Sequence, residues 1–392
     1  MGIYLDYNAS TPIDRRVLDV MIDVYQNKYG NADSRTHDYG EAARSVVENA
    51  RKQVADLLGI KKDEVFFTSG ATESDNISIL GLQEYAEKNS KKHIITTAIE
   101  HKAVLEPLHQ LEKQGFEVTY ISPDSNGRIN ADELLSKVRD DTLLVSVMHA
   151  NNETGIIQPI DVIGEELSKT DTFFHVDAAQ SFGKLVDELR NVKYNFLSAS
   201  AHKMYGPQGV GVLVLKKKRY KMPPVNSIMF GGSQEKGVRP GTVPTALIVG
   251  FGKACEIAAE EHASNFIKYQ NNKDVILAAL KLSGIDYSIN GNLEYAMPNT
   301  LNVSFNGVNS EALMLATRQY CAVSNGSACN SSSYKPSYVL SAMGLSLDRI
   351  ESAIRISWGF DIINQDSLNL LLEYAYPLNN HAPVKVGSNM LK

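Results

Sequence analysis

Two short stretches of this sequence indicate how the chain folds: VDAAQ at Val176–Gln180 and SAHK at Ser200–Lys203. Each follows an apolar run typical of a buried strand, Thr172–Val176 before the first and Asn195–Ala199 before the second. Neighbouring parallel strands end at the same edge of a sheet, and the ligands of such sheets bind beyond that edge. We therefore expect an acidic and a basic side chain to face one small molecule from two sides.

The acid and the base in these stretches are Asp177 and Lys203. Pyridoxal phosphate needs such a pair. A lysine bonds covalently to its aldehyde carbon, and a carboxylate keeps its ring nitrogen protonated so that the ring accepts electrons. Two unrelated surface charges are the alternative interpretation. The apolar flanks and the adjacent Gln180, Ser200 and His202 favour a cofactor site.

The composition is that of an ordinary globular protein. The 392 residues are 43% hydrophobic and 21% charged, and this length favours two domains or one large α/β domain with an appendage. A net charge of -6 argues against a broad nucleic-acid face, so no direct nucleic-acid binding is expected. No apolar run reaches the roughly 18 residues that span a bilayer, and the first residues lack the pattern of a secretory signal. We therefore expect no membrane attachment.

The three cysteines are Cys255, Cys321 and Cys329. They are too few and too widely spaced for a disulfide framework, which favours a reducing, cytoplasmic location. Cys255 and Cys321 have apolar neighbours typical of buried structural thiols. Cys329 lies among the small polar residues of Ser324–Ser333, which predict an exposed loop around one reactive thiol. No metal-ligand set is expected.

Short apolar runs alternate with helical patterns, which predicts a mostly parallel sheet covered by helices on both faces. The expected strands are residues 65–68, 93–97, 118–121, 143–147, 173–176, 195–199 and 209–215. The expected helices lie within 12–58 and over 73–87 and 104–114. Further on, the pattern predicts helices over 262–282 and 310–318 and strands over 300–305 and 354–357. We expect a large domain over 13–260 and a smaller α+β domain made of 1–12 and 261–392.

The segment Thr68–Ser74 joins a predicted strand to a predicted helix. Gly70 permits a tight turn there, after which the first N–H groups of the helix point into open space and can hold a phosphate. A simple N-cap by Ser69 or Thr72 is the alternative. The SAHK stretch would add a hydroxyl and an imidazole from a second strand end.

Three further polar residues follow predicted strands. His101 could lie flat on the cofactor ring and move protons, or it could be an ordinary surface histidine. Asn152 could bind a cofactor oxygen or a substrate carboxylate, or it could belong to a turn. Gln180 could donate to the phenolic oxygen of the cofactor.

Seven motifs occur in order along nearly the whole chain: Asp6–Ala9, Gly70–Ser74, Glu100–Lys102, Asn151–Gly155, Val176–Ser181, Ser200–Lys203 and Gly241–Thr242. Together they closely resemble the cysteine desulfurases of the class V aminotransferase group, of the NifS/IscS type. The resemblance implies the fold type I of pyridoxal-phosphate-dependent transferases. Its large domain has a mostly parallel seven-stranded sheet, and its smaller C-terminal domain is α+β.

The resemblance also implies a role for each matching residue. Lys203 would carry the cofactor, Asp177 would pair with its ring nitrogen, and His101 would stack on its ring. The other implied cofactor contacts are Ala71, Thr72, Asn152, Gln180, Ser200, Ala201, His202 and Thr242. Of these, Thr242 would reach the phosphate of a neighbouring subunit, which implies a homodimer. Pro240 stands where a serine is expected, but it leaves Thr242 in register.

Asn152 and Arg355 resemble the contacts of the family with a substrate carboxylate. The planar fork of a guanidinium suits that role, because it binds both oxygens of a carboxylate. The loop around Cys329 resembles the long catalytic loop of one group of these enzymes, although Asn325 replaces an expected serine.

The implied activity is removal of sulfur from L-cysteine, giving L-alanine and a persulfide on Cys329 that passes to an acceptor protein. Lys203 would move the α-proton, and either His101 or a lowered thiol pKa would make Cys329 a thiolate. An aminotransferase or a selenocysteine lyase of the same fold, and a sulfur relay without catalysis, are the alternatives. The acceptor stays open among iron–sulfur assembly, tRNA thiolation and DNA phosphorothioation. The stretch after Trp358 lacks the tail expected for docking to an iron–sulfur scaffold.

Overall fold

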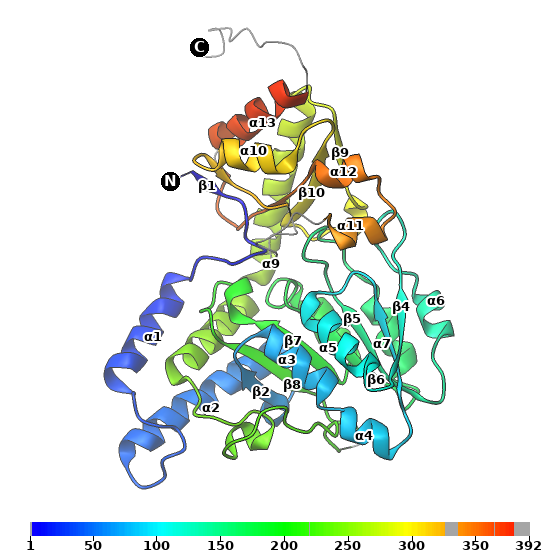
Figure 1. Cartoon of the computed structure of the whole chain (residues 1–392). Coiled ribbons are helices and arrows are strands. Elements are labelled where there is room, and N and C mark those ends of the chain that lie inside the picture. The colour runs from blue at the N-terminus through cyan, green and yellow to red at the C-terminus, as the bar shows by residue number, and fades with distance from the viewer. Residues whose placement is uncertain (1, 219, 326–335, 364, 380–392) are drawn as a thin grey trace.

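The computed structural model describes residues 2–218, 220–325, 336–363 and 365–379. A large unit containing the main sheet lies below a smaller unit, and the long helix α9 (Thr245–Leu282) runs through both (Figure 1). The expected catalytic loop around Cys329 lies outside the described residues. No described helix is long and apolar enough to cross a membrane.

In the described residues, a seven-stranded sheet has the order β2-β8-β7-β6-β5-β3-β4. The strands are β2 (Val65–Thr68), β3 (His93–Thr97), β4 (Glu117–Ile121), β5 (Thr142–Met148), β6 (Phe173–Asp177), β7 (Phe196–Ser200) and β8 (Gly211–Leu215). The pairs among β4, β3, β5, β6 and β7 are parallel, whereas β8 runs antiparallel to both of its neighbours. The expected mostly parallel sheet is therefore confirmed, and each expected strand matches within a few residues.

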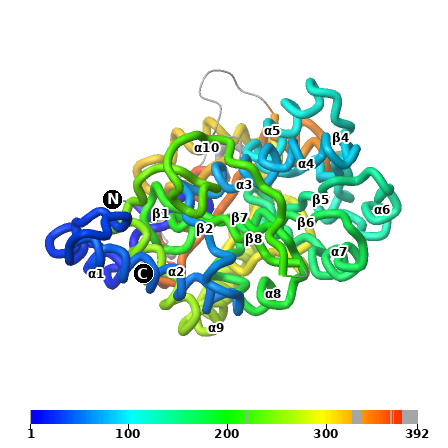
Figure 2. The backbone as a smooth tube through the Cα atoms, turned by 90° about the horizontal axis from the view of Figure 1, so that it is seen from below, coloured from blue at the N-terminus to red at the C-terminus, as the bar shows by residue number. Residues whose placement is uncertain are grey.

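Helices cover both faces of this sheet, which explains why β2, β3, β5, β7 and β8 are buried in every position. The large-unit helices are α1 (Arg15–Asn27), α2 (Asp38–Leu58), α3 (Ala71–Leu80), α4 (Gln83–Lys88), α5 (Lys102–Glu112), α6 (Ala131–Ser136), α7 (Ile160–Leu167) and α8 (Val186–Asn191). Figure 2 shows α3, α4 and α5 on one side of the sheet and α2, α8 and α9 on the other. Alternate strand residues supply the two cores: Ile95 packs toward α2 and α7, and Ile94 packs toward α3 and α5.

The single helix expected over 73–87 is wrong, because the structure has two helices that break at Gly81. The Gly81 carbonyl accepts a hydrogen bond from the Asn226 backbone N–H at 2.9 Å. A Cβ at position 81 would lie 2.6 Å from Val225 Cγ1 and 2.8 Å from the Asn226 carbonyl oxygen. The loop that contains Val225 and Asn226 therefore packs directly on Gly81 and interrupts the helix there. This is a tertiary contact, so the local sequence pattern does not predict it.

The smaller unit is built on a three-stranded antiparallel sheet of order β12-β10-β9. Its elements are β9 (Tyr287–Ile289), β10 (Thr300–Phe305), α10 (Ser310–Thr317), β11 (Cys321–Ala322), α11 (Tyr338–Ala342), α12 (Leu347–Glu351), β12 (Ala353–Ser357) and α13 (Gln365–Asn379). The N-terminal strand β1 (Ile3–Tyr4) pairs with β11, so the first residues contact this unit. Along α9, Phe251 packs in the large core and Ile276 in the small one, so the boundary expected at residue 260 lies inside a continuous helix.

Candidate active site

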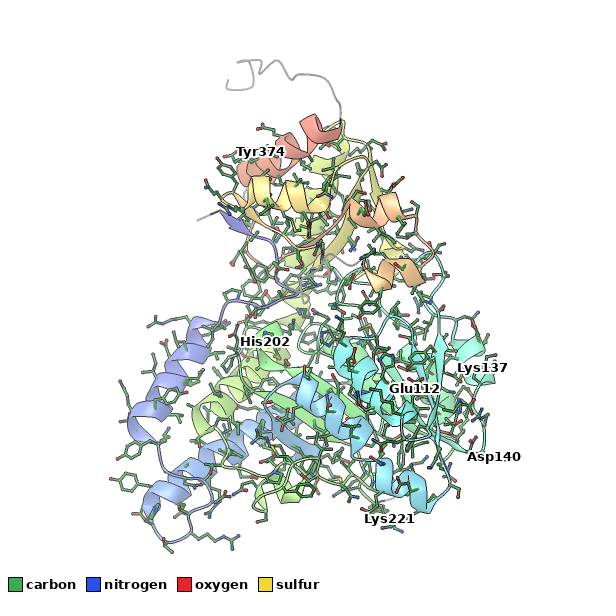
Figure 3. The ribbon with its side chains drawn as sticks, in the orientation of Figure 1. Glu112, Lys137, Asp140, His202, Lys221 and Tyr374 are labelled. Atoms are coloured by element: carbon green, nitrogen blue, oxygen red, sulfur yellow. The ribbon has the colours of Figure 1, made fainter. Side chains whose placement is uncertain are left out.

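A cleft of about 420 Å³ lies beyond the ends of β6 and β7, where the large unit meets the N-terminal segment and the small unit. Figure 3 labels His202 at this junction. The cleft gathers ten of the residues expected to form the site: Ala71, Thr72, His101, Asn152, Asp177, Gln180, Ser200, His202, Lys203 and Arg355. The short turn Ala201–Lys203 directly follows β7, and Asp177 is the last residue of β6.

Two expected site residues in the described part of the chain, Thr242 and Ala201, do not line the cleft. Thr242 is exposed on the loop before α9. Ala201 is fully buried in the main core, and its N–H donates to the carbonyl of Val210 at 3.1 Å. Cys329 falls outside the described residues.

The Lys203 amine is held by the N-terminal segment. Its Nζ donates to the carbonyl oxygens of Asn8 at 2.5 Å and Ala9 at 2.9 Å. The Asn8 carbonyl also accepts from Gln180 Nε2 at 3.0 Å. This contact leaves Gln180 Oε1 toward the cleft without a partner among the described residues. The second N–H of Gln180 Nε2 could still donate to a phenolic oxygen while the first holds the Asn8 carbonyl.

Asp177 is a buried acid beside this lysine. Its Oδ1 accepts from the Ala179 backbone N–H at 2.9 Å. Burial raises the pKa of Asp177 to about 6, and the neighbouring carboxyl of Asp75 adds to the shift. A cationic ring nitrogen against this carboxyl would favour its ionised form, because opposite charges in a buried site attract strongly.

His101 caps the N-terminus of α5. Its Nδ1 accepts from the Ala103 N–H at 3.1 Å, which places the ring proton on Nε2. Burial lowers the pKa of His101, and the charge of Lys203 acts in the same direction against that of Asp177. The ring is therefore neutral near physiological pH, as a stacking and proton-accepting histidine requires.

The opposite end of the cleft offers donors suited to an anion. The helix α3 begins at Ala71, whose N–H donates to Ser200 Oγ at 2.7 Å, so the hydroxyl proton of Ser200 is available to another acceptor. Gly211 permits this close approach, since a Cβ there would lie 2.5 Å from Gly70 Cα. Burial, with the charges of Lys203 and Lys184, lowers the pKa of His202 to about 4. A helix N-terminus and a hydroxyl here form a phosphate-binding arrangement.

Arg355 on β12 closes the cleft from the small unit. Its Nη2 lies 2.6 Å from Asp6 Oδ1, and its Nη1 donates to the Asn152 carbonyl at 2.9 Å. Only 5% of Arg355 is exposed, so the guanidinium is held rigidly by these two contacts.

Five buried polar atoms of this cleft have no hydrogen-bond partner among the described residues: Asn152 Oδ1, Gln180 Oε1, Arg355 Nε and both carboxyl oxygens of Asp75. Buried polar groups are almost always paired, so such a cluster indicates a ligand site. The other polar groups of the cleft correspond to the separate parts of pyridoxal phosphate. An anion site begins α3, a neutral imidazole and a buried acid lie between, and a lysine amine faces the acid.

Sequence reasoning missed several residues that hold this site. Asn8 binds Lys203 and Gln180 through its carbonyl, and its Nδ2 donates to Thr300 Oγ1 at 3.0 Å. The motif that contains Asn8 was identified from the sequence, but a contact made by a backbone carbonyl does not depend on the residue type and so could not be predicted. Lys184 Nζ donates to the carbonyls of Gln180 and Lys203, each at 2.9 Å, and resembled an ordinary solvated lysine.

Comparison with known proteins identifies the family. A family model described as aminotransferase class-V matches residues 3–367. Cysteine desulfurase IscS of Neisseria meningitidis is 46% identical over 359 residues, 91% of this chain and 87% of the relative. A solved NifS-like protein has a TM-score of 0.87 at 38% identity, covering 96% of this chain and 98% of its own. SspA in complex with cysteine has a TM-score of 0.79 at 37% identity, covering 92% and 99%. The chain therefore belongs to the class-V aminotransferase family, among the cysteine desulfurases of the NifS/IscS type.

Proposed function

We propose that the cleft binds pyridoxal phosphate and that the protein uses it to remove sulfur from L-cysteine. The family to which the chain belongs depends on this cofactor. One observation carries the proposal: Asp177, His101 and Lys203 come from three separate segments to one cleft, together with five buried polar atoms that lack partners among the described residues. A buried acid and a lysine amine in one cleft are what the cofactor requires.

Each end of the cleft has a distinct task in this proposal. The N–H groups at the start of α3, with Ser200 and His202, hold the phosphate. Asp177 binds the ring nitrogen, and His101 covers the ring. When bound, pyridoxal phosphate supplies an electron sink for charge that develops at the substrate α-carbon. Lys203 Nζ moves the proton at that carbon, and the carbonyls of Asn8 and Ala9 orient the amine for it.

Arg355 and Asn152 would orient the substrate through its carboxylate. Arg355 Nε is a buried donor in the cleft without a partner among the described residues, so it can bind a carboxylate oxygen. Asn152 would donate to the carboxylate through its Nδ2 group, because its Oδ1 is an acceptor. The solved structure of SspA in complex with cysteine supports cysteine as the ligand.

We assign the sulfur-accepting thiol to Cys329, on the resemblance of its segment to the family's catalytic loop. The other two cysteines support this choice by their burial. Burial raises the pKa of Cys321 to about 12 and that of Cys255 well above its usual range. Only a thiolate attacks sulfur efficiently, so neither buried thiol suits the task.

The persulfide would pass to an acceptor protein of iron–sulfur assembly, tRNA thiolation or DNA phosphorothioation. A homodimer is also proposed, because exposed Thr242 would then be available to the cofactor phosphate of the other subunit. We assign the reaction to the cytoplasm, in keeping with the free thiols of Cys255 and Cys321.

A trapping experiment tests the cofactor site. Purified protein loaded with pyridoxal phosphate is reduced with borohydride, digested, and mapped by mass spectrometry. The proposal predicts one modified peptide, with the added mass on Lys203. A matched variant, Lys184→Arg, should still be modified at Lys203, whereas Lys203→Ala should not be modified there. Modification at another lysine of the unsubstituted protein, or none, would contradict the proposal.

A further inference from the structure

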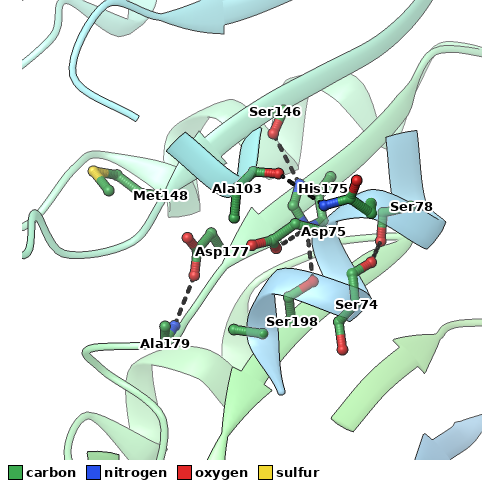
Figure 4. Close-up of polar contacts among 12 residues, drawn as sticks. Ser74, Asp75, Ser78, Ala103, Ser146, Met148, His175, Asp177, Ala179 and Ser198 are labelled. Carbon is green, nitrogen blue, oxygen red and sulfur yellow. Dashed lines mark hydrogen bonds and ion pairs between the residues drawn. The ribbon is translucent and has the colours of Figure 1, made fainter. Parts of the chain in front are cut away.

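A second carboxyl, that of Asp75 on α3, is buried at the floor of the cleft beside Asp177 (Figure 4). Only 1% of Asp75 is exposed. Neither of its oxygens makes a well-aligned hydrogen bond in the part of the chain that the structure describes. Its polar neighbours are His175 Nε2, at 3.4 Å, and the hydroxyl of Ser198. No lysine or arginine forms an ion pair with it among the described residues.

His175 connects the two acids. It lies on β6 two residues before Asp177, and alternation along a strand places both side chains on the same face of the sheet. Its Nδ1 lies 2.8 Å from Ser146 Oγ and its Nε2 lies 3.0 Å from Ser198 Oγ. The ring is fully buried, and burial lowers the pKa of His175 to about 4. It is therefore a neutral ring and supplies no charge to Asp75.

The two carboxyls differ in what stabilises their negative charge. Asp177 accepts the Ala179 N–H at 2.9 Å, whereas Asp75 accepts no backbone N–H among the described residues. Burial raises the pKa of Asp75 to about 7. The other acid of this region, Glu100, is equally buried, and its Oε1 accepts from Thr97 Oγ1 and the Met148 N–H. Burial nevertheless raises the pKa of Glu100 well above its usual range. Like charges in one buried site cannot all ionise, so Asp75 and Glu100 keep their protons and Asp177 carries the charge.

We propose that Asp75 is a positioning residue that stays protonated, so that the cluster of Asp75, His175 and Asp177 holds one negative charge and presents it on Asp177. The Asp75 O–H donates to Ser198 Oγ, the hydroxyl of Ser198 donates to Nε2 of neutral His175, and the Nδ1–H of His175 donates to Ser146 Oγ. The carboxyl proton thus stays on Asp75, away from the cofactor ring, and Asp177 remains ionised. This inference rests on the proposed function, since it assumes that Asp177 faces the ring nitrogen.

The test measures the proton directly in the loaded enzyme. Protein with ¹³C-labelled aspartate carboxyls is studied by NMR at about pH 6, one unit below the Asp75 pKa of about 7. We expect one carboxyl signal of a protonated acid, which Asp75→Asn removes. The control Asp19→Asn, at an exposed acid paired with Arg15, should retain it. In ¹⁵N spectra, His175 should carry its proton on Nδ1.

Cofactor affinity provides a second measurement. Asp75→Asn keeps a donor for Ser198 Oγ, whereas Asp75→Leu keeps the bulk and leaves Ser198 Oγ without that donor. We expect the leucine variant to weaken pyridoxal phosphate binding about tenfold and the asparagine variant to weaken it less. Equal weakening by both would show that the site needs a charge on Asp75 and would overturn the inference.

Failure of the proposed function can be distinguished from failure of the inference about Asp75. Unsubstituted protein that takes up no pyridoxal phosphate would refute the proposed function. Unsubstituted protein that binds the cofactor but shows no protonated aspartate, or one that persists in Asp75→Asn, would refute the inference alone. The NMR measurement on the unsubstituted enzyme tests whether an aspartate is protonated even if the leucine variant fails to fold.

Discussion

Replacing Arg355 by lysine should damage substrate binding while leaving the cofactor in place. In the structure one guanidinium contacts the Asp6 carboxylate at 2.6 Å and the Asn152 carbonyl at 2.9 Å, and its Nε is left without a partner among the described residues. A lysine ammonium is a single point charge and cannot hold Asp6 and a substrate carboxylate in the same planar arrangement.

The size of the effect follows from these contacts. Hydrogen bonds to charged groups contribute about 1.5–3 kcal/mol each, and truncating one partner of a buried charge pair costs about 2–5 kcal/mol. A loss of about 3 kcal/mol corresponds to roughly a hundredfold fall in kcat/KM for L-cysteine. Most of it should appear in KM, because the substrate carboxylate lies away from the atoms that react.

Steady-state alanine release measured against L-cysteine concentration separates kcat from KM. Asp6→Asn is the matched control, since it keeps the guanidinium and the Asn152 contact but removes the partly buried counter-charge. We expect its KM to change far less than that of Arg355→Lys. The reasoning would be refuted if Arg355→Lys kept its KM within about twofold while the cofactor absorbance stayed normal.

Three further predictions concern other parts of the site. Burial lowers the pKa of Lys184 from 10.5 to about 7, so between pH 7 and 10 the amine is neutral in the folded protein but still protonated in the unfolded chain. Stability should therefore rise by up to about 5 kcal/mol as pH increases from 7 toward 10, and this slope should vanish in Lys184→Met, as seen in thermal unfolding midpoints. Ser200→Ala leaves the Ala71 N–H without its acceptor and should weaken cofactor binding about tenfold in an absorbance titration; unchanged affinity would contradict a phosphate role. Cys329→Ser should abolish the protein-bound persulfide detected by mass spectrometry, whereas Cys321→Ser should retain it.

The architecture could be predicted from the sequence because it depends on local patterns of apolar and polar residues. Apolar runs fixed the strands of the main sheet, and the residues that end them, such as Asp177 and Ser200, could be placed at one edge of the sheet. The break between α3 and α4 was missed, because it depends on a loop that arrives more than a hundred residues later.

The supporting residues were missed for a different reason. Asn8 acts through its carbonyl oxygen, which every residue type possesses. Asp75 and Lys184 are charged residues that normally lie in solvent, and only the three-dimensional packing shows that both are buried. Sequence patterns thus identified the groups that would touch the cofactor, whereas the groups that orient them became visible only in the fold.

The central claim is that Lys203 performs the chemistry on L-cysteine in this cleft. It is tested most directly by measuring alanine released from L-cysteine under saturating pyridoxal phosphate, for the unsubstituted protein and for Lys203→Ala. We predict one alanine for each cysteine consumed by the unsubstituted protein, with no requirement for a 2-oxo acid. Release by Lys203→Ala should fall by at least about 100-fold. Alanine formed by Lys203→Ala at the unsubstituted rate, or release that depends on a 2-oxo acid, would contradict the account.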